Sequence, residues 1–365
     1  MKTKLTALVL AMLMLLSLAA CGEKKEDEQD LNLTEKPTYD YDLSEYITLP
    51  EHSALEVSCR LIAPTERDIE AVIEEETCRA GTSVEKIGDV AAAGDRVTYD
   101  SLGTRKSDGA VFEEGTARTA IIGGLSYLEG FTENFIGHTT GEVITFDYTY
   151  PADFYEESLA GVEVTYQMTI TKIEVITPVE FTDGYVKALD IEGVETTDQY
   201  REYLMELNKE RAAASNEQTI RDAVYAALVE GATLIKMPEL EYDYYYNICE
   251  KTNSTYARTA GITVEEYVVQ NYGSREAYEE YARSYSESHV IEDLVMWTLV
   301  REYGVTVDEE EYKNELQYGY DNYAPSYGAT DIEQFEKLVG QDLTEGILLK
   351  NALDAVAATA VVTEK

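Results

Sequence analysis

The residues that usually carry enzyme chemistry are few and scattered in this chain of 365 residues. Its three histidines, His52, His138 and His289, lie far apart, and there is no GxSxG, HExxH or phosphate-binding glycine loop. The acidic run at 308–311 lacks the ligand spacing of an EF-hand and is typical of a solvated helix start. The sequence therefore predicts no metal and no cofactor, and any chemistry must come from another kind of residue.

Cysteine content and charge narrow the function classes further. Besides Cys21, the chain holds Cys59, Cys78 and Cys249 without CxxC spacing, which favours three thiols over a zinc site or a disulfide framework. A Cys59–Cys78 bridge stays open as an alternative in an exported protein. The net charge of −42 argues against nucleic acid as a partner, because phosphate binding needs clustered Lys and Arg.

The elements that could position a site are clearest in residues 94–174. Apolar and polar residues alternate with period two over 97–99, 144–150 and 164–170. This pattern predicts antiparallel strands with one buried face.

Turn and helix signals lie between these strands. Asp108 and Gly109 form a hairpin signal after the first strand. Leu128, Phe131 and Phe135 fall at i, i+3 and i+7, which predicts one face of a short helix. We therefore expect a curved sheet wrapped over one helix.

In these residues the chain resembles the FKBP-type peptidyl-prolyl isomerase domain, in the version carried by bacterial trigger factor. The motifs that carry the resemblance are GDRVTYD followed by a Gly, VFEEG, the segment from Gly123 to Phe131, FIGHTTGE and YPADFYEESLAG, all in the expected order and spacing. The resemblance implies an isomerase without nucleophile, metal or cofactor. Rotation of an X-Pro bond meets a barrier of roughly 18–20 kcal/mol, and a dry apolar pocket favours the twisted, less dipolar amide.

The resemblance also assigns site residues, position by position. Those expected to act on the X-Pro bond are Phe112, Glu113, Tyr127, Leu128, Phe131, Tyr155 and Tyr166. Those expected to contact substrate in the same domain are Tyr99, Ser101, Ile122 and Phe154, with Phe154 an alternative to Tyr155 as the loop aromatic.

Two departures from the family pattern count against full activity. Ser101 replaces the aromatic residue of the first strand, and Arg118 with Ala120 replaces a bulkier apolar edge. Loss of one pocket ring removes on the order of 1.5–3 kcal/mol of apolar burial if nothing fills the gap.

The N-terminus resembles a bacterial lipoprotein signal. Residues 1–20 combine two lysines with a Leu/Met/Ala-rich core, and residues 18–22 read LAACG, a lipobox that would make Cys21 the acylated N-terminus. A plain secretory signal is the alternative. Residues 21–46 are charged and lack apolar periodicity, which predicts a flexible acidic tether. The expected location is the outer face of the cytoplasmic membrane, held there by the lipid anchor.

Three segments follow the expected tether. Residues 47–91 predict a connector whose helix packs on the C-terminal domain, and residues 92–176 are the expected isomerase domain. Residues 177–365 show an order of helices that resembles the trigger factor C-terminal chaperone domain. The family's N-terminal ribosome-docking domain has no counterpart, so no ribosome role is carried over.

Tyrosine is in excess, with 29 residues against 7 phenylalanines. Tyrosine combines an apolar face with a polar tip, so it suits a wet surface that still binds apolar segments. Tyr244 and Tyr245 of the helical part are expected either to contact unfolded clients or to be ordinary residues at the core edge.

The sequence thus predicts an α+β protein, with an FKBP-like curved antiparallel sheet over a short helix and an all-α, trigger-factor-like C-terminal domain. The expected function is that of an extracytoplasmic folding factor, which isomerises X-Pro bonds and holds unfolded or newly exported proline-containing polypeptides. A non-catalytic holdase or surface-binding lipoprotein on the same scaffold is the alternative, and a solute-capture lipoprotein is another.

Overall fold

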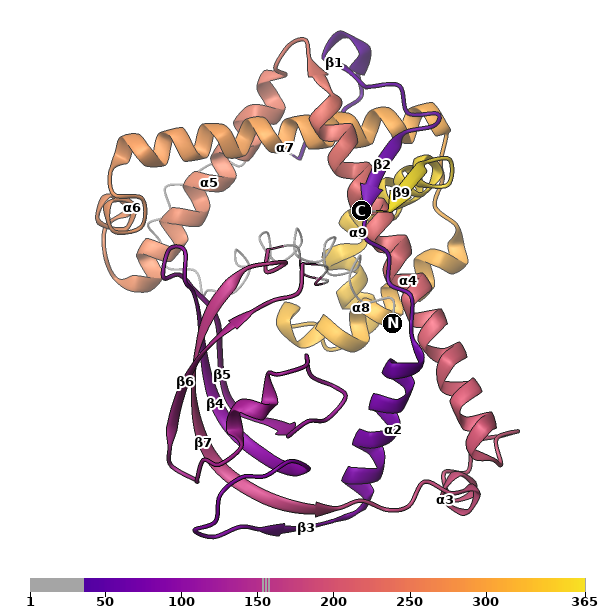
Figure 1. The fold of residues 1–365 in the computed structure, drawn as a ribbon. Helices are drawn as coiled ribbons and strands as arrows, with labels where there is room; N and C mark the ends of the chain where they lie inside the picture. The colour runs from indigo at the N-terminus through magenta and orange to yellow at the C-terminus, as the bar shows by residue number, and fades with distance from the viewer. Residues whose placement is uncertain (1–35, 153, 155, 157, 365) are drawn as a thin grey trace. The chain divides into compact units, whose positions relative to one another are not determined.

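The computed structural model describes residues 36–152, 154, 156 and 158–364. The predicted signal peptide, the lipidation site Cys21 and the loop residue Tyr155 lie outside the described residues. The predicted α+β class is confirmed, because a curved antiparallel sheet is followed by long helices (Figure 1).

The chain divides into two compact units. Residues 62–213 form the first, which we call the sheet unit. Among the described residues, 36–61 and 214–364 form the second, which we call the helical unit.

The sheet unit is built on strands that curve together (Figure 1). They are β3 (Thr82–Glu85), β4 (Asp95–Arg105), β5 (Val111–Ile121), β6 (Val143–Thr149) and β7 (Glu163–Thr177). Their order is β3-β7-β4-β5, β6 also pairs with β7, and every pairing is antiparallel. The predicted alternation is confirmed, since the apolar positions of β4 and β7 are buried in turn. These positions include Val97, Tyr99, Val164, Tyr166, Met168 and Ile170.

Glycines set the turns around this sheet. The predicted hairpin at Asp108-Gly109 joins β4 to β5, and Gly109 has a left-handed φ of 71°. The predicted helix over 128–135 is wrong in extent, because only the 3₁₀-helix η2 (Thr132–Phe135) forms. Gly130, with a φ of 78°, interrupts the helical path before it.

In the sequence of the sheet unit, one helix precedes the strands and others follow them. α2 (Glu66–Ala80) is the helix expected in the connector, and it begins at a capping box formed by Thr65 and Asp68. α3 (Asp183–Ala188) and the first turns of α4 (Thr197–Gly231) follow β7. The apolar contacts that join these helices come from Ile69, Ile73, Val186, Val194, Tyr200 and Leu204.

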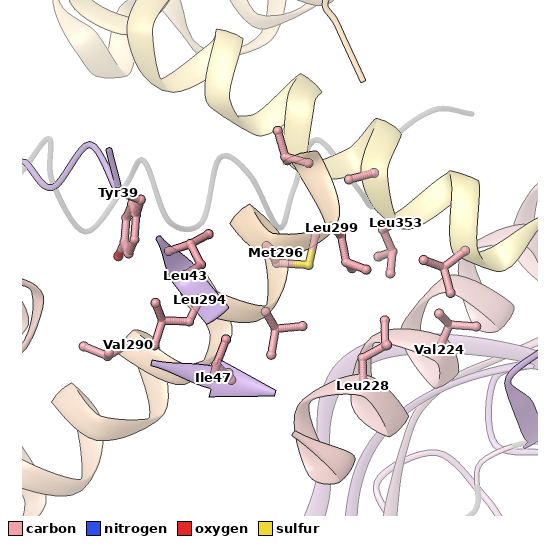
Figure 2. Packing of buried hydrophobic residues seen from close by; sticks show 14 of the residues in the cluster. Tyr39, Leu43, Ile47, Val224, Leu228, Val290, Leu294, Met296, Leu299 and Leu353 are labelled. Atoms are coloured by element: carbon pink, nitrogen blue, oxygen red, sulfur yellow. The ribbon is translucent and has the colours of Figure 1, made fainter. Parts of the chain in front are cut away.

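The helical unit holds the remaining turns of α4 and the helices that follow. These are α5 (Glu239–Ala260), α6 (Val264–Tyr272), α7 (Arg275–Tyr303), α8 (Glu309–Tyr323), the 3₁₀-helix η3 (Ala324–Tyr327) and α9 (Ile332–Ala357). Their core lies along α7, where Val290, Leu294 and Leu299 meet Val224, Leu228 and Leu353 (Figure 2).

Two short strand pairs bring distant parts of the helical unit together. β1 (Ile47–Thr48) pairs with β8 (Thr233–Leu234), and β2 (Glu56–Cys59) pairs in parallel with β9 (Val361–Glu364). The helical pattern expected for residues 177–365 therefore does not reach the end of the chain, because the chain leaves α9 to form β9.

The N-terminal segment corrects the predicted tether. Tyr39 and Leu43 are only 3% and 4% exposed, and they lie with Ile47 in the core along α7 (Figure 2). Leu43 belongs to the 3₁₀-helix η1 (Leu43–Glu45), which is capped by Asp42. The prediction of a flexible tether therefore does not hold for residues 36–46, because their apolar side chains are buried.

Candidate functional site

Eight aromatic rings of the sheet unit form one connected group, which we call the aromatic cluster. They are Phe112, Tyr127, Phe131, Phe146, Tyr148, Tyr150, Phe154 and Tyr166. Neighbouring ring centroids are between 4.6 and 6.3 Å apart. The pairing of β6 with β7 sets Phe146 opposite Tyr166, and the alternation along β6 turns Tyr148 to the same side.

Phe131 connects the largest number of these rings. Its centroid lies 5.1 Å from Tyr166, 5.7 Å from Phe146 and 5.6 Å from Tyr148, each in an edge-to-face arrangement. It also stacks on Tyr127 at 5.9 Å. Such pairs contribute about 0.5–1.5 kcal/mol each beyond their buried area. The ring of Phe131 is therefore held from several sides while 9% of the residue stays exposed.

Gly103 allows the ring of Phe112 to meet the cluster. A Cβ atom at position 103 would lie 2.7 Å from Cζ of Phe112 and 3.1 Å from Cε1 of Tyr166. Without that atom, the two rings meet edge to face at 5.7 Å. The glycine of β4 is therefore required by close approach and not by its backbone angles.

Several polar side chains next to the rings are joined by hydrogen bonds. Ser101 Oγ donates to Glu113 Oε1 at 3.0 Å, and the Tyr166 hydroxyl donates to Glu113 Oε2 at 3.0 Å. The hydroxyls of Tyr150 and Tyr166 are 2.6 Å apart. Arg118 Nε lies 3.6 Å from Glu113 Oε1. Both oxygens of this carboxylate are thus satisfied inside an otherwise apolar cluster.

The direction of these hydrogen bonds follows from the proton count. Burial, the Tyr150 hydroxyl and the Glu113 carboxylate raise the pKa of Tyr166, and burial raises the pKa of Tyr150, so both stay neutral. Tyr166 has one hydroxyl proton and donates it to Glu113. Tyr150 must then donate to Tyr166, which leaves the Tyr150 proton engaged when no substrate is bound.

The other predicted residues of the sheet unit lie in or beside this cluster. Tyr99 and Ile122 are buried in the same core, and Leu128 packs against it. Tyr127 donates its hydroxyl to the Thr119 carbonyl at 2.7 Å. The sheet therefore brings the predicted set together, with Tyr155 outside the described residues.

Two expectations need correction. Ser101 does not leave an open gap, because it is 5% exposed and its hydroxyl binds Glu113. Tyr244, expected to contact clients from a helix surface, is 7% exposed, and the hydroxyl of its neighbour Tyr245 donates to Asp293. Neither tyrosine offers a free exposed ring, because α5 turns this part of its surface toward α7.

Sequence reasoning missed three members of the cluster, Phe146, Tyr148 and Tyr150. Their signal was present in the alternating run 144–150, which marked them as one face of a strand. Over the described part of the chain, no three His, Cys, Asp or Glu side chains gather as a metal site.

Comparison with known proteins covers both units. Residues 196–363 match the model of the bacterial trigger factor protein (TF) C-terminus. Trigger factor from Limosilactobacillus fermentum is 25% identical, over 87% of this chain and 72% of that protein. Trigger factor from Streptococcus pneumoniae serotype 2 is 27% identical, over 87% of this chain and 75% of that protein. Residues 196–363 are therefore a trigger factor C-terminal domain, and the chain as a whole is similar to bacterial trigger factors.

The similarity of this chain to trigger factors extends beyond the C-terminal domain. Alignments that cover 87% of the chain must include most of the sheet unit, because the matched C-terminal domain begins only at residue 196. A solved trigger factor chaperone, studied for promiscuous substrate recognition, is 20% identical with a TM-score of 0.45, covering 86% of this chain and 73% of that chain.

Proposed function

We propose that this trigger factor-like folding factor isomerises X-Pro bonds at the aromatic cluster. The supporting observation is the cluster itself, in which rings surround a neutral pair of hydroxyls and one satisfied carboxylate. A proline ring is apolar and packs well among aromatic rings. The chemistry needs only rotation about the C–N bond, so no nucleophile has to be supplied.

The mechanism is stabilisation of the twisted amide. The planar amide has a large dipole that water solvates well, and the twisted amide has lost its resonance. Exclusion of water by Phe112, Phe131 and Tyr166 therefore favours the twisted state over the planar one. In this mechanism the hydroxyl of Tyr150 gives up its hydrogen bond to Tyr166 and donates instead to a carbonyl of the bound peptide, which it thereby orients.

The helical unit is proposed to hold the polypeptide whose prolines are sampled. Its supporting observation is a set of partly exposed tyrosines on α5, α6 and α7, among them the stacked pair Tyr256 and Tyr267 at 6.0 Å. A tyrosine ring can bind an apolar segment weakly through its face while its hydroxyl stays hydrated. The proposed partners are unfolded or newly exported proline-containing polypeptides.

The proposed location is the outer face of the cytoplasmic membrane, with Cys21 as the lipid attachment point. The support is the LAACG sequence at residues 18–22. Within the described residues, no helix is both long and apolar enough to cross a membrane. Two acyl chains anchor a protein stably, whereas one anchors it only marginally. Cys21→Ala should move the protein to the soluble fraction, and retention of this variant on membranes at high salt would show that the anchor is wrong.

The decisive test of catalysis is cis/trans exchange of short X-Pro peptides, measured by NMR. Phe131→Leu should slow the exchange, because it removes the ring that holds the cluster while keeping an apolar side chain in the core. Phe181→Leu is the matched control, since Phe181 packs on Tyr185 and Tyr200 in the same unit but outside the cluster.

The alternative function is that of a non-catalytic holdase. A folded wild-type protein that accelerates exchange on none of several X-Pro peptides, yet suppresses aggregation of an unfolded client, would establish that alternative. Acceleration by wild type that Phe131→Leu does not reduce would place catalysis outside the aromatic cluster.

A further inference from the structure

The N-terminal segment of the helical unit, residues 36–46, docks through one tyrosine in particular. The Tyr39 ring stacks on Trp297 with centroids 5.9 Å apart and planes at 23°, and its hydroxyl donates to the Asp293 carboxylate. Arg301 donates to the main-chain carbonyls of Tyr39 and Tyr41. We call this segment the strap.

The receiving groups form one face of α7. Asp293, Trp297 and Arg301 are spaced four residues apart, so they follow one another along the helix surface. Each recognises a different part of a peptide: the carboxylate accepts from a phenol, the indole packs on a ring, and the guanidinium binds main-chain oxygens. Tyr245 of α5 donates to the same oxygen, Oδ2 of Asp293, and so helps to fix the position of the carboxylate.

The contacts from α7 involve the side chain of Tyr39 and main-chain carbonyls, and they do not involve the side chains next to Tyr39 in sequence. Thr38 and Asp40, on either side of Tyr39, are exposed to solvent. Lys36 adds ion pairs to Asp342 and Glu345 of α9. A different unfolded polypeptide that contains a tyrosine could therefore make the same contacts with Asp293, Trp297 and Arg301.

The strap is held in a conformation that it does not prefer. Tyr39 has a φ of 56°, in the left-handed region that residues with a Cβ seldom adopt. Side-chain contacts must impose this angle, so the docked state carries a local cost. The strap ends with η1, and the next element, β1, pairs with β8 without any contribution from residues 36–41. Release of residues 36–41, which include Tyr39, therefore leaves the pairing of β1 with β8 in place.

We propose that Asp293, Trp297 and Arg301 form a tyrosine-binding socket that Tyr39 fills in cis, and that a tyrosine-containing segment of an unfolded polypeptide fills it in trans when the strap leaves. The trans occupant rests on the proposed client-holding function. The socket and its cis occupant do not.

The first experiment tests the socket alone. Trp297 is the only tryptophan of the chain, so its fluorescence reports the socket directly. In the chain from residue 22 onwards, Tyr39→Ala should empty the socket, and a synthetic peptide of residues 36–46 should then bind saturably and change the Trp297 emission. The same peptide with Ala in place of Tyr39 should not bind. Wild type should bind the peptide at least about 100-fold more weakly, because a tethered strap competes at roughly millimolar effective concentration.

Matched variants keep this test decisive. Thr38→Ala changes an exposed strap residue next to Tyr39, so it should leave the socket filled like wild type. If Tyr39→Ala fails to fold, Tyr39→Phe keeps the ring and removes only the bond to Asp293, and it should bind the peptide more tightly than wild type does. A folded variant of either kind that shows no tyrosine-dependent peptide binding overturns the socket.

The second experiment tests exchange with a client. A reduced, unfolded, tryptophan-free protein is titrated into wild type, with its binding followed independently by fluorescence anisotropy. Hydrogen exchange of strap amides should increase and Trp297 emission should shift as the client saturates. A client that binds without either change overturns the trans role while the holding function stands. A client that does not bind at all counts against the holding function and against the trans occupant, and the peptide experiment still decides the socket.

Discussion

Gly103→Ala is the substitution that examines the aromatic cluster most directly. The added Cβ would lie 2.7 and 2.9 Å from Cζ and Cε1 of Phe112 and 3.1 Å from Cε1 of Tyr166, where ordinary contacts begin near 3.4 Å. Tyr166 is fully buried and cannot retreat, so the half-buried Phe112 ring must swing toward solvent. Overpacking of this kind costs about 1–3 kcal/mol, and the freedom of Phe112 places this case near 1 kcal/mol.

The expected result is a small loss of stability with a large loss of isomerase activity. A loss of 1 kcal/mol lowers the Tm of a domain of 150–250 residues by about 2–4 °C. Displacement of the Phe112 ring opens the cluster to water, and about 1.5 kcal/mol of lost apolar contact corresponds to roughly tenfold slower exchange. Thermal unfolding followed by circular dichroism and NMR exchange on one X-Pro peptide measure the two effects.

Gly184→Ala is the matched control for that experiment. This glycine lies in α3 of the same unit, and the nearest atom to an added Cβ is Thr182 Oγ1 at 3.6 Å. The control should leave exchange unchanged and stabilise the helix by up to about 0.5–1 kcal/mol. If Gly103→Ala keeps both the wild-type Tm and the wild-type exchange rate, the contact between Phe112 and Tyr166 does not matter for either property.

Other substitutions have expected outcomes of their own. Tyr166→Phe should raise the exchange rate about 2- to 10-fold by freeing the Tyr150 hydroxyl, since such a hydrogen bond is worth about 0.5–1.5 kcal/mol. Tyr150→Phe should lower the rate. If both variants changed the rate in the same direction in the NMR assay, Tyr150 would not be the donor to Tyr166. Thr65→Ala should lower the free energy of unfolding by about 1 kcal/mol in a urea titration, because it removes the capping box of α2. Burial raises the pKa of Cys249 to about 12, so its alkylation at pH 8 should be about 1000-fold slower than in urea, by mass spectrometry. Equal labelling rates would show that the surroundings of this thiol open freely.

The sequence predicted the inward face of each strand, because a period of two determines which side chains share a face. It could not predict which rings touch, since that depends on the register between β6 and β7. Phe146 meets Tyr166 across that pairing, and nothing near either residue indicates it. The hydrogen bonds between the polar side chains were hidden for the same reason, because Glu113 and Tyr166 are 53 residues apart.

The errors at the N-terminus and at the short helix have local physical causes. Charged composition predicted disorder for residues 21–46, yet Tyr39, Leu43 and Ile47 are spaced to bury their side chains once α7 is present. That burial depends on partners more than 240 residues away, such as Asp293, at a separation of 254. The helix over 128–135 was predicted from its apolar spacing alone. The prediction did not take account of Gly130, whose positive φ interrupts the helix.

Ser101, Glu113 and Tyr166 are best understood as one unit. A serine in place of the expected ring removes apolar surface, but it supplies a donor to one oxygen of Glu113, and the hydroxyl of Tyr166 supplies a donor to the other. An unsatisfied carboxylate oxygen in this cluster would cost about 1–3 kcal/mol or more, which is comparable to the apolar contact that the missing ring would have provided. Restoring an aromatic residue at position 101 without changing Glu113 would therefore leave that oxygen with the more distant Arg118 as its remaining partner, at 3.6 Å. The loss of an aromatic ring at position 101 is thus offset by the hydrogen bond that the serine hydroxyl donates to Glu113, so the effect of a change at position 101 depends on Glu113.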